Sequence, residues 1–444
     1  MGRFKFVHTA DIHLGSFLHA DGAESLPGLQ ELCREATYRA FENICRLAIQ
    51  NKARFLLISG DLYDREARSV RANRFFADWC KRLADEGILT FVTAGNHDPV
   101  REYQELFALP QQVHLFSADR PEIIYISDEE GRNIAAVAGQ SYRDKWEKSP
   151  LHLNYPKPEG DIFRIAMLHT QLESGKSSYI PSSAAELAEC PDFDYWALGH
   201  IHKPQLIRNR HPVIAYPGSP QGRDFGEQDP GGCWLIEVDG REIVRMDYHI
   251  TSPVVYRSLF IDIGCPELQQ ADSLDQLAEH MLSHAQNISD RELSDRETGE
   301  SGVPEAYIVR WEIGGRGPLH YYLKNDLQGS GQELCRYMRD MLGNRTPFLW
   351  TDSVTVRTAG PVTDKVLERH PALRELLDQT VLSIQQDASV SKQFISQLGQ
   401  AWDPDTDYED RNDARLPLDD QTLGNIIEDA SRLLLEGLSE GGEE

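Results

Sequence analysis

Apolar residues in the first hundred positions form short strand-like runs that alternate with stretches of helical spacing. The strand-like runs cover residues 4–9, 55–59 and 88–93. Between them, over 30–50 and 70–86, apolar side chains recur with the period of an amphipathic helix. This β-α-β-α-β order predicts a sheet with helices packed on its faces.

The pattern changes after residue 130, where short strands follow one another with few helical stretches between them. Two packed sheets flanked by helices accommodate both halves of this region, so we expect an α/β fold over residues 1–252. The strands expected in the second half are 134–138, 162–168, 195–198, 213–216, 232–238 and 242–249.

Two further regions follow the plausible boundary at Ser252-Pro253. Residues 253–360 predict a small α+β domain, and residues 361–444 predict a helical, acidic C-terminal region. The small domain is expected to hold strands that start near 254, 306 and 353, helices at 273–286 and 331–342, and a polar loop at 287–304.

The C-terminal region carries helical patterns at 363–399 and 420–437, separated by the acidic stretch 403–413. The last helix has an apolar stripe that includes Leu423, Ile427 and Leu434. Such a stripe packs either on its own domain or on a partner protein. The acidic spacer before it favours the partner.

Composition limits the cellular setting and the kind of partner. The seven cysteines contain no Cys-x-x-Cys pair, which predicts a reducing compartment rather than a disulfide framework. No run approaches the roughly 20 apolar residues of a membrane helix, and the first strand leaves no room for a leader peptide. We therefore expect a cytoplasmic protein. The net charge of −26 argues against a polyanionic partner, unless a local basic surface, bound metals or a partner subunit holds it.

Five short motifs in the first 202 residues supply metal ligands, each where a strand-like segment ends. Each motif alone is weak evidence for a metal site, because a Gly-Asp after a strand is usually a turn and a lone histidine is usually a polar residue with its hydrogen bonds satisfied. Together they predict a centre in which two divalent metals clamp a phosphodiester and activate a water. The motifs are Asp11-Ile12-His13, Gly60-Asp61, Gly95-Asn96-His97-Asp98, His169 and Gly199-His200-Ile201-His202.

Spacing within the motifs assigns roles. Asp11 and His13 alternate by two and so project to one side of a strand end, as do His200 and His202. Asp61 is the best candidate for a ligand that bridges both metals. Asn96 offers a neutral oxygen. His97 points elsewhere, so it can meet the phosphate or the leaving group, and Asp98 is a candidate partner that orients it.

These motifs make the chain resemble the calcineurin-like metallophosphoesterase superfamily. His8-Thr-Ala-Asp-Ile-His-Leu-Gly15 and Tyr216-Pro-Gly-Ser-Pro, followed by Phe225-Gly-Glu227, are similar to its DNA repair exonuclease branch, which includes the SbcD-like nuclease subunits. The resemblance covers residues 1 to about 250. It implies a four-layer α/β/β/α sandwich, then a capping domain and a helical tail.

The resemblance also implies the ligand sets and the partners. One metal takes Asp11, His13, Asp61 and His202, the other takes Asp61, Asn96, His169 and His200, and His97 is the catalytic histidine. The metals implied are Mn²⁺, and the partners are DNA and an SMC-like coiled-coil ATPase that binds the tail. At Asp64 the chain departs from the archaeal and eukaryotic members, which carry a second functional histidine after the Gly-Asp, so the direction of digestion stays open.

Basic residues near the motifs are candidate DNA contacts. Arg65, Arg68, Arg71 and Arg74 recur every third residue and form a stripe beside the metals if this segment is helical. The alternative is a solvated helix face paired with Asp64, Glu66 and Asp78. Lys203 and Arg223 flank the site loops and are weaker candidates, and roles for His19 and for a homodimer stay open.

The sequence therefore predicts a Mn²⁺-dependent DNA nuclease that acts in DNA repair. One alternative is a metallophosphoesterase for a small nucleotide or pyrophosphate. The other is a non-catalytic scaffold that loads an ATPase onto DNA, and the complete set of ligands argues against it.

Overall fold

The structure is a computed structural model that describes residues 2–64, 69–101, 106–172, 179–297, 304–343, 347–360, 375–376, 379–383 and 430. The chain divides into two compact units, Met1–Ala359 and Gly360–Glu444. In the second unit, residues 375–376, 379–383 and 430 are helical. The remainder of the helical patterns predicted at 363–399 and 420–437 lies outside the described residues.

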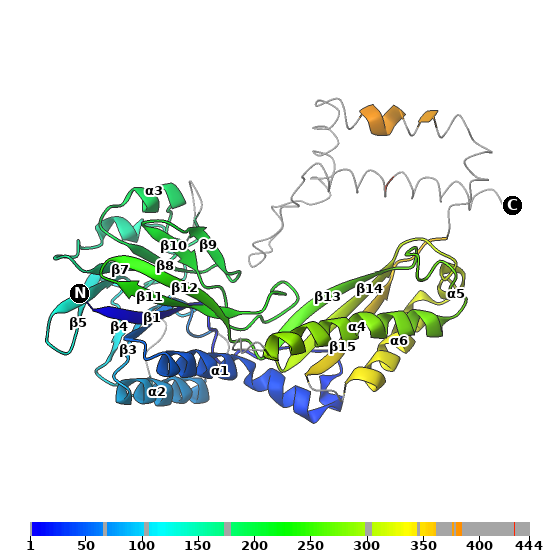
Figure 1. The fold of residues 1–444 in the computed structure, drawn as a ribbon, viewed down its shortest axis with the longest axis horizontal. Coiled ribbons are helices and arrows are strands. Elements are labelled where there is room, and N and C mark those ends of the chain that lie inside the picture. The colour runs from blue at the N-terminus through cyan, green and yellow to red at the C-terminus, as the bar shows by residue number, and fades with distance from the viewer. Residues whose placement is uncertain are drawn as a thin grey trace. The chain divides into compact units, whose positions relative to one another are not determined.

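Two six-stranded sheets form the first part of Met1–Ala359 (Figure 1). The first sheet has the order β12-β11-β1-β2-β3-β4, and the second has the order β5-β6-β7-β8-β10-β9. The strands of the first are β1 Arg3–Thr9, β2 Phe55–Ser59, β3 Leu89–Thr93, β4 Val113–Leu115, β11 Gly232–Asp239 and β12 Glu242–Ile250. Those of the second are β5 Glu122–Ser127, β6 Asn133–Gly139, β7 Phe163–His169, β8 Tyr195–Gly199, β9 Gln205–Arg208 and β10 Val213–Tyr216.

Helices cover the outer faces of both sheets. Buried side chains of α1 (Pro27–Gln50) and α2 (Val70–Asp85) share one core with the first sheet. The second sheet shares another core with α3 (Ala184–Glu189) and the short 3-10 helix η2 (Leu151–Asn154). An aromatic-rich core fills the space between the sheets, where Phe6 stacks on Phe55 with ring centroids 5.0 Å apart. The predicted α/β/β/α layering is confirmed.

Strand β2 shows why the sequence pattern was informative. All five of its residues are buried, because β1 and β3 pair with it on both sides and cores cover both faces. A parallel strand in that position is apolar throughout rather than alternating. Short strands were harder to predict: β4, β5 and β9 are exposed or half-buried at most positions and were not anticipated.

A three-stranded parallel sheet follows within the same unit. Its core packs the strands against helices α4 and α6. A separate apolar cluster joins its Tyr256, Ile308 and Trp350 to Leu29 and Leu32 of α1. The elements are β13 Val254–Asp262, α4 Leu274–Glu297, β14 Ala306–Gly314, α5 His320–Leu323, α6 Leu327–Leu342 and β15 Phe348–Val356, and the 3-10 helix η1 (Ala23–Ser25) lies before α1.

The polar loop predicted at 287–304 is wrong in its first part, because α4 continues to Glu297. Residues 287–297 are polar but contain neither glycine nor proline, and they include the good helix formers Arg, Glu and Leu. Polarity alone did not separate a solvated helix from a loop. Among the described residues, no helix is long and apolar enough to cross a membrane.

Candidate metal centre

The predicted ligands gather at the carboxyl ends of five strands. Asp11, Asp61 and Asn96 follow β1, β2 and β3, which are parallel neighbours in the first sheet. His169 ends β7 and His200 follows β8, which are parallel neighbours in the second. Parallel strands present their carboxyl ends at one edge, so the fold brings together residues up to 189 positions apart.

The backbone at four of these ligands is left-handed. φ is 51° at Asp11, 46° at His13, 50° at Asp61 and 100° at His200. Such conformations cost on the order of 1–3 kcal/mol each for residues with a side chain, and they concentrate at functional sites. Hydrogen bonds hold them: the Asp11 amide donates to the Gly60 carbonyl at 3.1 Å, and the His200 amide donates to the Asp11 carboxylate at 3.0 Å.

Two glycines make the close approach of the two sheets feasible. A Cβ on Gly199 would lie 1.9 Å from the Ser59 carbonyl oxygen of the other sheet. Gly60 has φ of +94°, and a Cβ there would lie 2.1 Å from Nδ1 of His169. Any side chain at either position would separate the ligands, so both positions require a residue without a Cβ.

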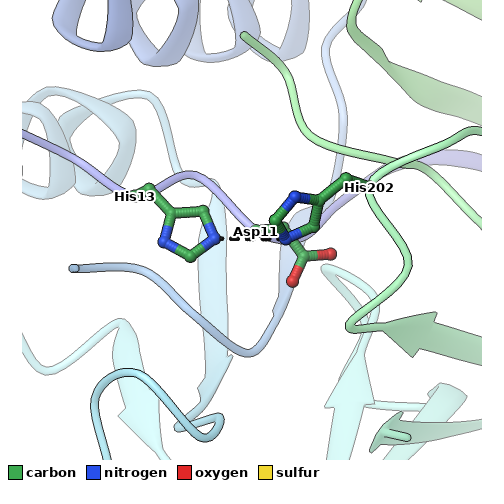
Figure 2. A group of neighbouring side chains, drawn as sticks. All are labelled: Asp11, His13 and His202. Atoms are coloured by element: carbon green, nitrogen blue, oxygen red, sulfur yellow. Dashed lines mark hydrogen bonds between the residues drawn. The ribbon is translucent and has the colours of Figure 1, made fainter. Parts of the chain in front are cut away.

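Asp11, His13 and His202 form one cluster, whose ligand atoms all lie within 4.8 Å of one another (Figure 2). The two Nε2 atoms of His13 and His202 face each other at 3.4 Å. Nδ1 of His202 lies 2.6 Å from Oε1 of Glu227 and donates its proton to that carboxylate. The lone pair of Nε2 is then the one that can bind a metal. Nδ1 of His13 is buried and has no hydrogen-bond partner among the described residues.

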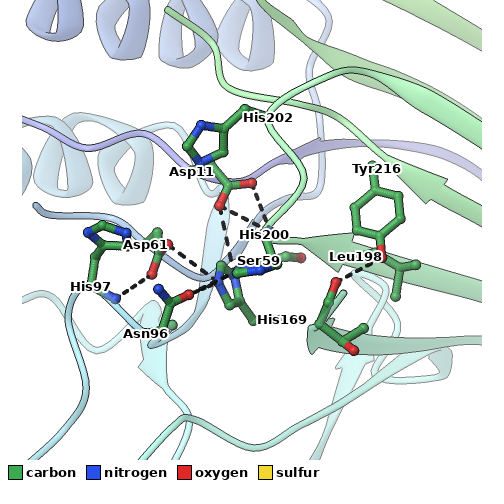
Figure 3. Close-up of polar contacts among 12 residues, drawn as sticks. Asp11, Ser59, Asp61, Asn96, His97, His169, Leu198, His200, His202 and Tyr216 are labelled. Atoms are coloured by element: carbon green, nitrogen blue, oxygen red, sulfur yellow. Dashed lines mark hydrogen bonds and ion pairs between the residues drawn. The ribbon is translucent and has the colours of Figure 1, made fainter. Parts of the chain in front are cut away.

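Asp11, Asp61 and His169 form a second cluster, and Asn96 and His200 lie against it (Figure 3). His169 Nδ1 donates to the Ser59 carbonyl at 2.9 Å, so Nε2 faces Asp61 Oδ2 at 3.3 Å and Asn96 Oδ1 at 2.9 Å. His200 Nδ1 lies 3.0 Å from the same amide oxygen. Asp11 belongs to both clusters, and the bridging role of Asp61 stays a prediction.

Burial makes this arrangement dependent on positive charge. Burial raises the pKa of Asp11. Burial also acts to raise the pKa of Asp61, but the charge and hydrogen bond of His169 outweigh it and hold that pKa well below its usual range. Burial lowers the pKa of His169, but the charge of Asp61 outweighs it and the pKa rises to about 9. Buried carboxylates need a neighbouring cation.

The donor set fits divalent metals. Two carboxylates, one amide oxygen and four imidazoles converge. In the part of the chain that the structure describes, one ring nitrogen each of His13 and His200 is buried without a hydrogen-bond partner. Oxygen and imidazole donors of this kind suit Mn²⁺, Fe²⁺ and Zn²⁺. One group of residues would be Asp11, His13 and His202, and the other would be Asp61, Asn96, His169 and His200.

His97 lies at the rim, and Asp64 is its carboxylate partner. Its Nδ1 is 3.3 Å from Asp64 Oδ1, and its backbone amide donates to Asp61 Oδ1 at 3.0 Å. The side chain of His97 is 28% exposed, whereas those of His169 and Asp61 are 1% exposed. Burial lowers the pKa of His97, but the hydrogen bond to Asp64 and the nearby carboxylate charges outweigh it, so the pKa is raised.

The orienting role predicted for Asp98 is wrong. Its carboxylate accepts from the backbone amides of Gly95 at 2.8 Å and Tyr63 at 3.1 Å, so it holds two site loops together. Asp98 is buried behind the loop, while the imidazole of His97 points to the rim. Adjacent residues in a tight turn diverge, and only the fold brings Asp64 opposite His97.

The predicted DNA contacts pair with acidic side chains. Arg71 pairs with Glu35, and Arg74 lies 3.6 Å from Asp78. Arg65 and Arg68 lie outside the described residues. The remaining candidates are Lys203, which lies 3.6 Å from Asp229, and Arg223, which lies 3.1 Å from Asp64; His19 is exposed beside Asp21.

Sequence reasoning missed the part that Glu227 plays. The motif Phe225-Gly-Glu227 supported the resemblance, but no role was assigned to its carboxylate, which is the partner of His202. A histidine ligand ordinarily has such a partner. That expectation was the available signal, although spacing alone does not identify which acid supplies it.

Residues 4–204 match the family model described as calcineurin-like phosphoesterase. The uncharacterized metallophosphoesterase YhaO of Bacillus subtilis is 31% identical over 281 residues, which cover 63% of this chain and 67% of that protein. The chain belongs to the calcineurin-like phosphoesterase family. Members of this family of hydrolases use divalent metals, and the chain has candidate groups of Asp and His to hold them.

Nuclease components are among the relatives of this phosphoesterase. The DNA double-strand break repair protein Mre11 of Archaeoglobus fulgidus is 25% identical over 292 residues, which cover 62% of each chain. The D component of the nuclease SbcCD of Bacillus subtilis is 24% identical over 256 residues, which cover 50% of this chain and 63% of that protein. The alignment thus spans less than two thirds of each of these two relatives.

Proposed function

We propose that this phosphoesterase is a Mn²⁺-dependent DNA nuclease that acts in DNA repair. The observation that carries the proposal is the convergence of all seven predicted ligands at one edge of the paired sheets, beside His97. The likeness to relatives named as double-strand break repair and SbcCD nuclease proteins supports DNA as the substrate.

The chain's own residues divide the work of the reaction. When bound, the two metals would supply Lewis-acid stabilisation of the phosphate and a more acidic water. His97 carries a raised pKa and is paired with Asp64, so it is suited to stabilise charge on the phosphate or to protonate the leaving oxygen. Asp64 would keep Nδ1 of His97 as a donor and direct its other nitrogen toward the substrate.

The substrate is expected to approach from the side of His97. Asp11, Asp61 and His169 are almost fully buried, whereas the side chains of His97, Asp64 and His202 are between 24% and 28% exposed. A phosphodiester would therefore meet His97 and His202 first. Arg71 and Arg74 are 60% and 66% exposed, so each has room to exchange its acidic partner for a phosphate.

The partner proposals rest on the family resemblance of the sequence rather than on the site. We propose that the region after residue 360 binds an SMC-like coiled-coil ATPase. The seven cysteines are free, which supports the predicted reducing, cytoplasmic setting. A homodimer is a further proposal to be tested by light scattering of the purified chain.

Substrate choice tests the function against its alternatives. The purified chain, loaded with Mn²⁺, is incubated with linear double-stranded DNA, single-stranded DNA, nucleotide monoesters and a dinucleoside pyrophosphate. The nuclease proposal expects DNA cleavage that is lost on chelation and in Asp61→Asn. Turnover of nucleotides without DNA cleavage would favour the small-substrate alternative. Mn²⁺ binding without turnover of any of these would favour the scaffold.

A further inference from the structure

The loop between β10 and β11 contacts both the metal centre and the three-stranded sheet. Its residues 222–228 present side chains in two directions. Arg223 and Glu227 contact the metal centre, while Phe225 and Gln228 contact the β13–β15 sheet. We call these residues the coupling loop.

On the side of the metal centre, the guanidinium of Arg223 lies between two carboxylates, each of which is the partner of a histidine. Arg223 lies 3.1 Å from Asp64 Oδ2, and Asp64 Oδ1 is the partner of His97. The same guanidinium lies 3.7 Å from Glu227 Oε1, which holds Nδ1 of His202 at 2.6 Å. Arg223 thereby joins the candidate catalytic histidine to a candidate metal ligand.

The engagement of Arg223 leaves it unsuited to hold DNA. Its side chain is 22% exposed and faces two carboxylates, and its backbone amide also donates to Glu227 Oε2 at 3.0 Å. Paired, partly buried charges of this kind are costly to separate. A phosphate contact would require breaking both pairs beside the metals.

On the other side, the three-stranded sheet holds the coupling loop. The Phe225 ring packs on Tyr256 of β13 with centroids 4.8 Å apart, and the Arg310 guanidinium of β14 lies 3.8 Å above the same ring. The Gln228 side chain accepts from the Ser258 amide at 2.7 Å, and its backbone carbonyl accepts from Arg257 at 2.7 Å. These contacts are both polar and aromatic, and they come from β13 and β14.

We propose that the β13–β15 sheet sets the geometry of the metal centre through the coupling loop, with Arg223 and Glu227 as positioning residues. Glu227 fixes the ring of His202, and Arg223 aligns Glu227 with Asp64. Charge-assisted pairs depend on distance and angle, so a shift of Phe225 misaligns both carboxylates. The effect on His97 rests on the proposed function, whereas the effect on metal affinity does not.

The experiment compares variants on the two sides of the coupling loop, with Mn²⁺ as the probe. Mn²⁺ affinity is measured by calorimetry, and kcat and KM are measured on bis(p-nitrophenyl) phosphate. Loss of a partner behind a ligand typically weakens metal affinity by about 10–100-fold. We expect losses in that range for Arg223→Gln and Glu227→Gln and a smaller loss for Phe225→Ala. Phe260→Ala removes an aromatic ring that is 58% exposed on the same strand as Tyr256 and should change neither quantity.

A double-mutant cycle separates coupling from general destabilisation. Phe225→Ala should weaken Mn²⁺ binding less in the Glu227→Gln background than in the wild type, because both act through His202. Strictly additive losses, or unchanged Mn²⁺ affinity in a folded Phe225→Ala chain, would overturn the proposal. If Phe225→Ala does not fold, Phe225→Leu takes its place in the same cycle, with the same readings.

Failure of the proposed function would look different. A wild-type chain that binds Mn²⁺ but cleaves neither DNA nor the small diester would refute the nuclease proposal. The calorimetric cycle would still decide whether the coupling loop positions the metal ligands.

Discussion

At the scale of single residues, backbone strain and ligand chemistry coincide. Of six described non-glycine residues with positive φ, four are predicted metal ligands. Strain of this kind persists only where the surroundings over-determine the conformation. Here the hydrogen bonds between motifs do so, because the Asp11 carboxylate receives the His200 amide and the Asp61 carboxylate receives the His97 amide.

Asp61→Asn tests the bridging role. An amide has one oxygen donor and no charge, so we expect loss of hydrolysis and weaker binding of both Mn²⁺ ions, with the fold intact. Calorimetry and circular dichroism measure the two properties. A variant that binds two Mn²⁺ per chain with unchanged affinity would refute the bridge.

His97→Ala tests catalysis separately from metal binding. His97 lies with His13 and Asp64 in a further group of donor atoms within 4.8 Å of one another, but it is absent from the two groups that contain Asp11. The family resemblance leaves His97 off the metals, so removing its ring is expected to spare metal affinity. Turnover should fall by about 10²–10⁴-fold, the range for one general acid. Asp64→Asn is the matched variant and should give a smaller loss. Elemental analysis that finds a metal missing from His97→Ala would show that His97 is itself a ligand.

His8 gives a prediction about stability and pH. Burial lowers its pKa to about 3, with a small opposing effect of the Leu198 carbonyl. Below pH 6.5 His8 is therefore protonated in the unfolded chain but stays neutral in the folded chain. The free energy of unfolding decreases as the pH is lowered. Between pH 7.5 and 5.5 the loss is about 1.4 kcal/mol. Urea unfolding of the metal-free wild type should show this extra loss relative to His8→Gln, and equal losses would mean that folded His8 is protonated.

At the scale of elements, helix α2 shows how an exposed face supports two interpretations. Its Ala72, Phe76 and Leu83 are buried against the first sheet, and Ser69 caps its first turn through the Ala72 amide. The opposite face carries Arg71 and Arg74, each beside an acid on the surface. Exposed ion pairs contribute little to stability, so Arg71 and Arg74 are available to contact DNA phosphates.

The double variant Arg71→Ala/Arg74→Ala tests that use. If both hold phosphates, the slope of log affinity for DNA against log salt should flatten by about 0.9 per lost contact. Hydrolysis of bis(p-nitrophenyl) phosphate should barely change. Glu242→Ala/Val244→Ala, on the far edge strand β12, serves as a surface control. An unchanged slope would leave Arg71 and Arg74 as partners of Glu35 and Asp78 alone.

At the scale of the whole molecule, all motif residues lie in the unit Met1–Ala359. Deleting everything after Ala401 should therefore leave Mn²⁺ affinity and basal nuclease activity nearly intact. It should abolish association with the proposed coiled-coil ATPase, as measured by pull-down and by ATP-dependent stimulation. Recovery of the ATPase by the truncated chain would move the docking site elsewhere, and an insoluble product would mean that the deleted helix completes the protein's own core.

The layered architecture was predictable because its signals are local. Buried parallel strands such as β2 are apolar throughout, and helices such as α1 show their period directly. Edge strands such as β9 were not predictable, since a half-solvated four-residue strand carries little pattern. The far end of α4 was missed because residues 287–297 are mostly polar and carry no continuous apolar stripe.

The sequence by itself determined which residues are candidate ligands, since the types and order of donors at strand ends are properties of the chain. Only the tertiary structure decided which side chains meet. Asp64 replaces Asp98 as the partner of His97, Glu227 holds His202, and Arg223 joins the two carboxylates. The contacts of Asp64 with His97, of Glu227 with His202 and of Arg223 with Asp64 join residues 33, 25 and 159 positions apart. They depend on how parallel strands, two sheets and one loop converge in space, which spacing along the chain does not encode.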